Sequence, residues 1–542
     1  MRVPRSDTVS ARVLTVLILM APALAAQQPG GTAQLSGVIR NSVTGLPVAK
    51  ATIRLVPSTN RVGYVRTSNA SGAFAFDGIA PGDYHLRLER RGYLDDAKGV
   101  QTGSALHLTA GQKITDLDLL ATPLAVITGT VTDADGEPIP YAVVQLIKQN
   151  WSIDGRRYQA VTGDNANEQG EFRLNDMAPG RYYLYAARGP MDGPVKDPSG
   201  KGELRLASLY YPNAATIDGA APIELRAGQE LTGVLMKLPW VPCYHVRGQA
   251  QQGAQEVQLL KRHNGQALPW DEQDGDPGRD RTFDIAGVTA GDYFLRAGTN
   301  MRIGGETPIT VTSHDVNGLA ATAASVEFRA HVRVEGEVSG LGLFLQRNDG
   351  PEFDHVSTVA VQPDGTARLP GIGPARYILW AGSREGGAYV KSVVIAQQEL
   401  RTQELDFTRD VPPDLEIVVG TGSGRVQGTV QWPDTTQTGP PFGAADPIKA
   451  VLVPQQPRAG IRPAWMSEID QNTGFAFSDV PPGKYFAFVT ANLDEGLWMN
   501  REFIGLVQGS GAALEVPEKG NVQVQAPVLP IAVAQRAMDT IR

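Results

Sequence analysis

Cysteine is almost absent from the chain. The 542 residues include one, Cys243, so no disulfide can form within the chain. We therefore expect stability to come from packed cores, in units of about 100 residues that are large enough to fold without cross-links. Cys243 itself is predicted to be a small buried apolar residue.

Zinc-binding and nucleophile motifs are also missing. None of the seven histidines begins an H-x-x-E or H-E-x-x-H sequence, in which a short turn aims two side chains at one zinc ion. Residues 420–424 read Gly-Thr-Gly-Ser-Gly and place glycine where a serine nucleophile would stand. The sequence therefore predicts that the chain is not an enzyme and has no catalytic, cofactor-binding or metal-binding residues.

Blocks of positive charge are missing too. The chain has 49 Lys and Arg against 57 Asp and Glu, a net charge of −8, with no basic cluster. This charge would repel a phosphate backbone, which excludes nucleic acid as a partner. One acidic stretch, residues 271–280, has enough carboxylates for a Ca²⁺ ion in principle, but its spacing is not that of a known calcium loop. A solvated hairpin loop is our preferred interpretation.

Long apolar runs are limited to one, near the N-terminus. Residues 13–20 follow Arg2, Arg5 and Arg12 and lead to Ala-Leu-Ala-Ala at 23–26. The run is too short to span a membrane comfortably and is typical of a secretory signal peptide. We predict a signal peptide at residues 1–26, export to the periplasm, the outer surface or the medium, and no transmembrane helix after its removal.

What the chain does have is an internal repeat rich in turn residues. The 60 glycines and 38 prolines favour many short elements over long helices. A phrase of alternating apolar residues, a turn and a second alternating run occurs five times, and its first apolar position always precedes a tyrosine by ten residues. The turn reads Pro-Gly in the first, second and fifth copies, Ala-Gly in the third and Pro-Ala in the fourth. The five pairs are Phe74 and Tyr84, Phe172 and Tyr182, Phe283 and Tyr293, Ala367 and Tyr377, and Phe475 and Tyr485.

The phrase predicts two antiparallel strands joined by a turn. In the first copy, Phe74, Phe76, Tyr84 and Leu86 should share one buried face, because side chains of a strand alternate. Each repeated tyrosine should place its ring in the core and its hydroxyl on a backbone group near the rim. We interpret these tyrosines as packing residues.

Flanking elements complete the repeat. Small opening strands are expected at Gly37, Gly129, Gly248, Gly336 and Gly428, and closing strands follow Ala-Gly-Gln at 110–112 and 227–229. Each unit would then hold about six or seven short strands, which suits an antiparallel β-sandwich. The fold class is predicted to be all-β, a tandem array of about five such sandwiches.

The repeats divide the chain into five units, called units one to five. They are predicted to span residues 34–122, 123–241, 243–332, 333–412 and 413–528, with a tail at 529–542. Units three and four are degenerate copies. No long linker separates the units, so a semi-rigid rod is expected, in which each unit contacts mainly its neighbours along the chain.

The repeated phrase G-x-F-x-F-x-x-I-x-P-G-x-Y-x-L, with G-x-P-V-x-x-A-x-I-x-L before it, resembles the carboxypeptidase regulatory-like domain. The resemblance covers roughly residues 34–528; it is strong in units one and two, good in unit five and degenerate in units three and four. It implies transthyretin-like (prealbumin-like), carbohydrate-binding-like β-sandwiches, as in exported bacterial proteins made of several such modules. It also implies accessory or binding modules and carries over no catalytic residue.

Aromatic residues outside the repeated positions are the candidate ligand contacts, because sugars stack on exposed rings. Packing inside cores or between units is the alternative role for them. The candidates are Trp151, Tyr158, Tyr210, Tyr211, Trp270, Trp465 and Trp498.

Two functions remain open, and a third, an enzyme whose residues lie on loops without a recognisable motif, is disfavoured. The first is a non-catalytic structural or ligand-binding rod of the cell envelope or the secreted fraction, with a carbohydrate or an envelope protein as partner. The second is an accessory component that binds glycan or peptide for a polymer-degradation or uptake system. The sequence indicates neither the ligand nor the oligomeric state.

Overall fold

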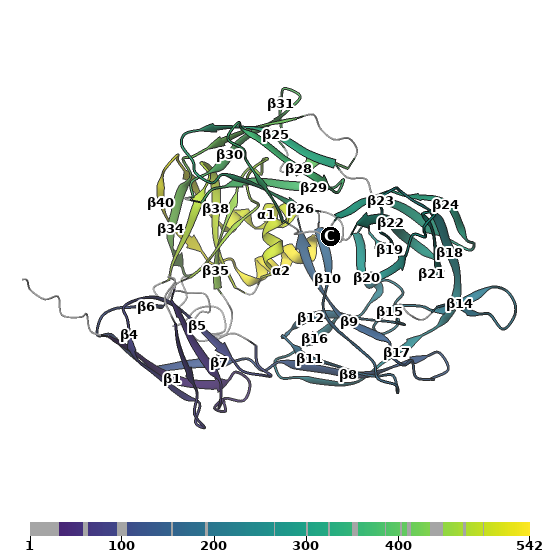
Figure 1. Ribbon diagram of the computed structural model, residues 1–542. Coiled ribbons are helices and arrows are strands. Elements are labelled where there is room, and N and C mark those ends of the chain that lie inside the picture. The colour runs from purple at the N-terminus through teal and green to yellow at the C-terminus, as the bar shows by residue number, and fades with distance from the viewer. Residues whose placement is uncertain are drawn as a thin grey trace, which may run out of the picture.

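Short strands make up most of the structure, and they form five β-sandwiches (Figure 1). The computed structural model describes residues 32–57, 63–94, 106–152, 155–189, 193–264, 266–299, 302–322, 326–348, 356–384, 386–401, 404–408, 414–433, 448–469, 473–491 and 493–541. The predicted all-β array of sandwich units is confirmed. The predicted signal peptide, residues 1–26, lies outside the described residues.

Every unit repeats one topology of seven strands, which we letter a to g in chain order. Strands d, a and g pair side by side in one sheet, and strands c, b, e and f pair in the other; inserted strands enlarge the first sheet to five strands in units three and four and the second sheet to five strands in unit two. In each unit the pairing of a with g is parallel, which adds a parallel pair to the predicted antiparallel sandwich. A separate hydrophobic core fills each sandwich.

The strands of the first three units have the following bounds. Unit one contains β1 (Ala33–Asn41), β2 (Thr52–Pro57), β3 (Tyr64–Thr67), β4 (Ala73–Ile79), β5 (Gly82–Glu89), β6 (Leu106–Leu108) and β7 (Lys113–Ala121). Unit two contains β8 (Ala125–Asp133), β9 (Val143–Ser152), β10 (Gly155–Asn165), β11 (Glu171–Met177), β12 (Gly180–Ala187), β16 (Ile223–Leu225) and β17 (Glu230–Leu238). Unit three contains β18 (Trp240–Ala250), β19 (Glu256–His263), β20 (Gln266–Gly275), β21 (Thr282–Thr289), β22 (Gly291–Thr299), β23 (Arg302–Val311) and β24 (Val316–Ala321).

The last two units follow the same order. Unit four contains β25 (Val326–Glu335), β26 (Gly342–Arg347), β27 (Val356–Ala360), β28 (Thr366–Ile372), β29 (Arg376–Gly382), β32 (Glu404–Asp406) and β33 (Leu415–Gly420). Unit five contains β34 (Gly424–Gln431), β35 (Ile448–Pro454), β36 (Trp465–Glu468), β37 (Gly474–Val480), β38 (Gly483–Ala491), β39 (Ala512–Val516) and β40 (Asn521–Pro527).

Insertions add further elements to units two, four and five. In unit two they are β13 (Val195–Lys196), β14 (Glu203–Leu206), β15 (Leu209–Tyr210) and the short helix η1 (Ile217–Gly219); in unit four, β30 (Tyr389–Ile395) and β31 (Gln398–Glu399). Unit five adds η2 (Glu495–Met499), α1 (Arg501–Val507), η3 (Gln508–Ser510) and α2 (Ile531–Thr540). Strand β14 leaves unit two and pairs with β18 of unit three, which ties these two units together.

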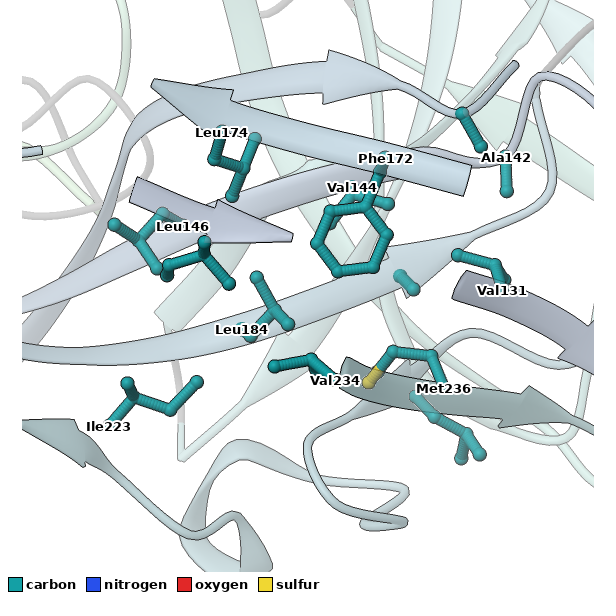
Figure 2. Close-up of a cluster of buried hydrophobic side chains, with 14 of the residues drawn as sticks. Val131, Ala142, Val144, Leu146, Phe172, Leu174, Leu184, Ile223, Val234 and Met236 are labelled. Carbon is teal, nitrogen blue, oxygen red and sulfur yellow. The ribbon is translucent and has the colours of Figure 1, made fainter. Parts of the chain in front are cut away.

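The two strands of the repeated phrase do not pair with each other, contrary to the prediction. In unit one β4 pairs with β1 in one sheet, whereas β5 pairs with β2 in the other. The turn at Pro81 therefore links the two sheets instead of closing a hairpin. The burial pattern is nevertheless as predicted, because Phe74, Phe76, Tyr84 and Leu86 meet in the same core from opposite sheets. Figure 2 shows the equivalent core of unit two, in which side chains of both sheets converge around Phe172.

The repeated tyrosines behave as predicted in all five units. Each ring is buried, and each hydroxyl donates to the backbone carbonyl four residues earlier. The five distances from hydroxyl to carbonyl oxygen are 2.8 Å for Tyr84, 3.0 Å for Tyr182, 2.9 Å for Tyr293, 2.9 Å for Tyr377 and 2.6 Å for Tyr485. The hydrogen bond ties the end of strand d to the start of strand e, because the carbonyl lies in the turn between them.

Glycine is required at the opening position of the repeat for steric reasons. A Cβ on Gly129 would lie 2.0 Å from the carbonyl oxygen of Val234 and 2.7 Å from the ring of Phe172. Gly248 and Gly428 meet a closing-strand carbonyl and a phenylalanine ring in the same way. The glycine thus makes room for the aromatic residue of strand d and for the parallel strand g.

In unit four the predicted opening glycine, Gly336, is wrong. It lies just after β25, and the residue opposite the first apolar position, Ala367, is Ala330. Alanine fits there because Ala367 has no ring to cover the strand. The predicted bounds of this unit, 333–412, also omit β33 and nearly all of β25. Gly336, on which the predicted start depends, follows the first strand instead of lying within it.

The predicted rod and the predicted tail both need correction. Units two and five are joined, because Trp151 of β9 lies in a cluster formed otherwise by residues of unit five. Residues 529–542 are not a separate tail, since α2 lies within them and packs into the same cluster. In Figure 1, β10 of unit two reaches α2 near the centre of the molecule, so units two to five form a closed arrangement.

Candidate functional site at the joints between units

The seven candidate aromatic residues are packed against other parts of the protein. Four of them are nearly covered, with exposed fractions of 8% for Trp151, 6% for Tyr158, 2% for Tyr210 and 1% for Trp498. Tyr211 packs against the core of unit two and Trp465 against the core of unit five, where its ring meets Tyr485 edge-on. Apart from Tyr211 and Trp465, the candidates lie in two joints between units: Tyr158, Tyr210 and Trp270 in one, and Trp151 and Trp498 in the other.

The first joint lies between units two and three. Tyr158, Tyr183, Tyr185 and Tyr210 form a cluster on the outer face of the five-stranded sheet of unit two, together with Ile217. Trp270 of unit three packs against this cluster, and its indole Nε1 donates to the Tyr210 hydroxyl at 3.1 Å. The rings of Tyr185 and Tyr210 are tilted with centroids 5.2 Å apart, and those of Tyr158 and Tyr183 meet edge-on. Three predicted contact residues therefore lie in one interface.

Polar groups complete this joint. Lys261 of β19 lies 3.4 Å from the Asp271 carboxylate, and the Ser208 hydroxyl of unit two donates to Asp271 at 3.0 Å. The carboxylate of Asp271 raises the pKa of Lys261, although burial acts in the opposite direction. Asp271 is thus used as an internal ion-pair partner and hydrogen-bond acceptor.

The acidic stretch 271–280 is not the loop that we expected. Its first half belongs to strand β20, which pairs with β19, and the Asp271 carboxylate lies beside Lys261 where the register of this pair shifts. Within the part of the chain that the structure describes, no three His, Cys, Asp or Glu side chains lie close enough to share a metal ion. Cys243 is buried in β18, as predicted, and burial raises the pKa of its thiol to about 11.

A second contact of the same joint involves η1. His263 Nε2 lies 2.9 Å from the carboxylate of Asp218, and Asn264 Nδ2 donates to the same carboxylate at 2.9 Å. Burial alone would raise the pKa of Asp218, but these hydrogen bonds outweigh it and hold that pKa below its ordinary value. Units two and three are thus held by both apolar and charge-assisted contacts.

The second joint lies between units two and five. The outer face of the four-stranded sheet of unit five carries Phe488 and is covered by η2, α1 and α2. Trp498 of η2 packs between Phe488 and Phe503, with ring centroids at 5.1 and 5.4 Å. Trp151 of unit two enters this same cluster, and the Arg156 guanidinium lies 5.6 Å from the centroid of its ring.

Two joint residues outside the list of candidates, Tyr183 and Tyr185, carry a signal in the sequence. Strand β12 reads Tyr-Tyr-Leu-Tyr-Ala from 182 to 186, and all five residues are buried. A strand with apolar residues on both faces is typical of a sheet covered on both sides. Tyr183 and Tyr185 were therefore recognisable as outer-face residues of a covered strand. The partner across the joint could not be read from this run.

Alkaline titration should report on the first joint. Burial, with smaller contributions from Tyr183 and Asp218, raises the pKa of Tyr158 to about 12 from its ordinary value of 10. The folded joint favours the neutral phenol of Tyr158. The contribution of this phenol to the free energy of unfolding is therefore complete below pH 10 and is lost as the pH rises toward 12. In an absorbance titration at 295 nm, Tyr158→Phe should remove a tyrosine that ionises late. Removal of one that ionises near pH 10 would contradict the assignment.

Unit five carries a cleft beside its contact with unit four. The cavity has a volume of about 360 Å³ and lies between the loop after β35 and the turn before β38. Its polar lining combines Gln455, Gln456, Arg458, Lys484 and Glu515, and its apolar lining is formed by proline, isoleucine and tyrosine. Arg458 also donates to the backbone carbonyl of Lys391 in unit four, so one wall of the cleft is fixed by the neighbouring unit.

No helix within the described ranges is long and apolar enough to cross a membrane.

Three comparisons place these observations among known proteins. The family model of the carboxypeptidase regulatory-like domain matches residues 34–119 and 126–197. The comparison with curated proteins gives no significant match.

Solved structures of bacterial surface proteins resemble the chain weakly. The TIE protein of Bacillus anthracis is 10% identical, with 71% of this chain and 69% of that chain covered and a TM-score of 0.15. The minor pilin of Streptococcus agalactiae is 15% identical, with 39% and 97% covered and a TM-score of 0.21. The shaft pilin of Lactobacillus rhamnosus GG is 12% identical, with 39% and 98% covered and a TM-score of 0.20. These TM-scores are too low to equate the arrangements of whole chains.

The first match spans the sandwich of unit one, and the second covers strands a to e of unit two; both units have the repeated glycine, aromatic and tyrosine positions in the expected places. Units one and two are therefore carboxypeptidase regulatory-like domains in tandem.

Proposed function

We propose that the chain is an exported, non-catalytic structural protein whose sandwich units build a scaffold in the periplasm, on the outer surface or in the medium. The observation that supports this proposal is the position of the large aromatic residues. Trp151, Trp498, Tyr158, Tyr210 and Trp270 pack between units, where they hold the scaffold together. Large rings contribute the most buried area per residue, which is what a joint between folded units needs.

Export is tested first. We expect the full-length chain, expressed in a bacterial host, to be recovered outside the cytoplasm and to begin after Ala25 or Ala26 when its mass is measured. As a control, Leu17→Arg should interrupt the apolar run and leave the precursor uncleaved, because a charge in that run opposes insertion. A chain that reaches the same compartment with residues 1–26 still attached would contradict the signal-peptide assignment.

A second candidate function is favoured by the cleft of unit five. We propose as the alternative that the chain is an accessory protein that binds glycan or peptide. The volume of about 360 Å³ lies in the range of small-molecule sites, and amide, cationic and anionic side chains in one cleft suit a ligand rich in hydroxyl or amide groups.

One experiment separates the two functions. The mature chain is applied to glycan and peptide arrays beside Gln456→Ala and Lys484→Ala, two changes at exposed side chains of the cleft. The scaffold function predicts the same background signal for all three proteins. The accessory function predicts binding that one or both changes weaken by about tenfold, the loss expected when one good hydrogen bond to a bound ligand is removed.

A further inference from the structure

The hairpin formed by β9 and β10 extends beyond the sandwich of unit two. These strands have 10 and 11 residues, whereas the matching strands b and c of unit one have 6 and 4, and those of unit five have 7 and 4. The extra length carries residues 150–152 and 155–157 toward the centre of the molecule, where β10 lies beside α2 in Figure 1. We call these six residues, three at the end of β9 and three at the start of β10, the hairpin tip.

The hairpin tip contacts unit five through one indole and backbone groups. Trp151 is one of the twelve buried residues of the cluster, and the other eleven belong to unit five. Asn500 Nδ2 donates to the carbonyl oxygen of Ser152 at 3.3 Å, and Arg156 Nη2 donates to the carbonyl oxygen of Ile541 at 3.4 Å. These contacts join residues that lie more than 300 positions apart in the sequence.

The hairpin tip also contacts unit four. Arg157 is 6% exposed, and its guanidinium donates to the Ser152 hydroxyl at 3.1 Å and to the carbonyl oxygen of Asn348 at 3.3 Å. Next to Asn348, the buried Arg347 lies 3.4 Å from Glu306 of unit three. The tip therefore lies where units two, four and five meet, close to the contact between units three and four.

Gly496 of η2 allows the backbone of unit five to lie close to the backbone of Trp151 in unit two. A Cβ on Gly496 would lie 2.1 Å from the carbonyl oxygen of Trp151 and 2.8 Å from its carbonyl carbon, and the third nearest atom would be a side-chain oxygen of Asp494 at 3.0 Å. Gly496 does not have a positive φ. Its lack of a side chain is thus required by the contact with unit two and not by the conformation of unit five.

We propose that the hairpin tip is a latch that holds units two to five in the closed arrangement, and that its release opens the chain without unfolding any unit. The latch adds a single apolar side chain to a cluster that unit five otherwise supplies by itself. Each sandwich, in contrast, has its own core of many buried residues. The contacts that are fewest in number should separate first, since local stability follows buried apolar contacts.

Release would expose two complementary surfaces at once. The Trp151 ring and the pocket that it leaves beside Trp498 would both become accessible. A partner that binds either surface would bind only the open chain and would shift the population toward it. The latch therefore gives the scaffold two states, closed and open, that differ in shape and in exposed aromatic surface.

Gly496→Ala tests the latch in the full mature chain. The added methyl group should clash across the joint with Trp151 and open the latch, whereas Gly505→Ala in α1 is the matched control, because a Cβ there meets nothing within 4 Å. We expect Gly496→Ala to increase the radius of gyration and the maximum dimension in small-angle scattering, with unchanged far-ultraviolet circular dichroism. Gly505→Ala should change neither.

A second variant tests whether the expansion results from loss of the joint or only from a disturbance of η2 around residue 496. Trp151→Ala should give the same expansion as Gly496→Ala, and in both variants amides of residues 150–152 should exchange on the order of tenfold faster or more, as expected of a locally opened segment. Unchanged dimensions in both variants would overturn the proposal. So would loss of the circular dichroism or exchange protection of α1 and α2, which would make the hairpin tip part of the folding core of unit five.

Discussion

Replacing Tyr182 by alanine should lower the free energy of unfolding of unit two by about 3–5 kcal/mol, the range found for large aromatic truncations in cores. The ring is buried in the core of unit two, and the hydroxyl donates to the carbonyl oxygen of Ala178 at 3.0 Å. The change removes both the ring and the hydrogen bond that ties strands d and e. A loss of this size is comparable to the whole stability of a small domain.

The matched controls separate the ring from the hydroxyl. Tyr182→Phe keeps the ring and removes one hydrogen bond, so it should cost about 0.5–1.5 kcal/mol. The measurement is thermal and denaturant unfolding of the mature chain, with hydrogen exchange used to assign the change to unit two. Equal losses in both variants would show that the ring contributes little, and the assignment of this tyrosine to packing would be wrong.

The same substitution in unit one should have a more local effect. Tyr84 has the same hydrogen bond, to Ala80 at 2.8 Å, and packs in the core of unit one. Unit two contributes to the joints with units three and five, whereas the clusters at those joints contain no residue of unit one within the described ranges. Tyr182→Ala should therefore also weaken exchange protection in η2, while Tyr84→Ala should leave it unchanged.

The alternation of residues predicted the buried faces but not the strand pairing. Phe76 and Tyr84 point into one core whether strands d and e pair as a hairpin or lie in opposite sheets, since the alternation is the same in both cases. The ten-residue spacing therefore gave the right core residues and the wrong partner for β5. Pairing depends on contacts with β1 and β2, which the repeated phrase does not contain.

The joints were harder to predict because their partners lie far apart in the sequence. The sequence of strand e shows which faces of its sheet are covered. In unit one, Asp83, His85 and Arg87 alternate with apolar residues, so one face is polar. In unit two, Tyr183 and Tyr185 take the matching positions, and both faces of the strand are apolar. This run indicates that something covers the outer face of unit two. It cannot identify Trp270 as the residue that does so.

Replacing Gly129 by alanine should be among the most damaging small substitutions in the chain. The new methyl group would lie 2.0 Å from the carbonyl oxygen of Val234 and 2.7 Å from the Phe172 ring, so the parallel strand β17 or the ring must move. Overpacking a core costs typically 1–3 kcal/mol, and a clash with backbone on one side and a buried ring on the other should reach about 3 kcal/mol or more.

Unit four supplies the comparison that tests this explanation. It has Ala330 opposite Ala367, where unit two has Gly129 opposite Phe172, so alanine is accepted when the ring is absent. The double variant Gly129→Ala, Phe172→Ala should therefore cost less than the sum of its two single changes, by about 1 kcal/mol or more, as for other contacting pairs. The measurement is a double-mutant cycle on the unfolding of unit two in the mature chain. Strict additivity would show that the ring does not require the glycine, and that the clash with the Val234 carbonyl alone excludes a side chain at this position.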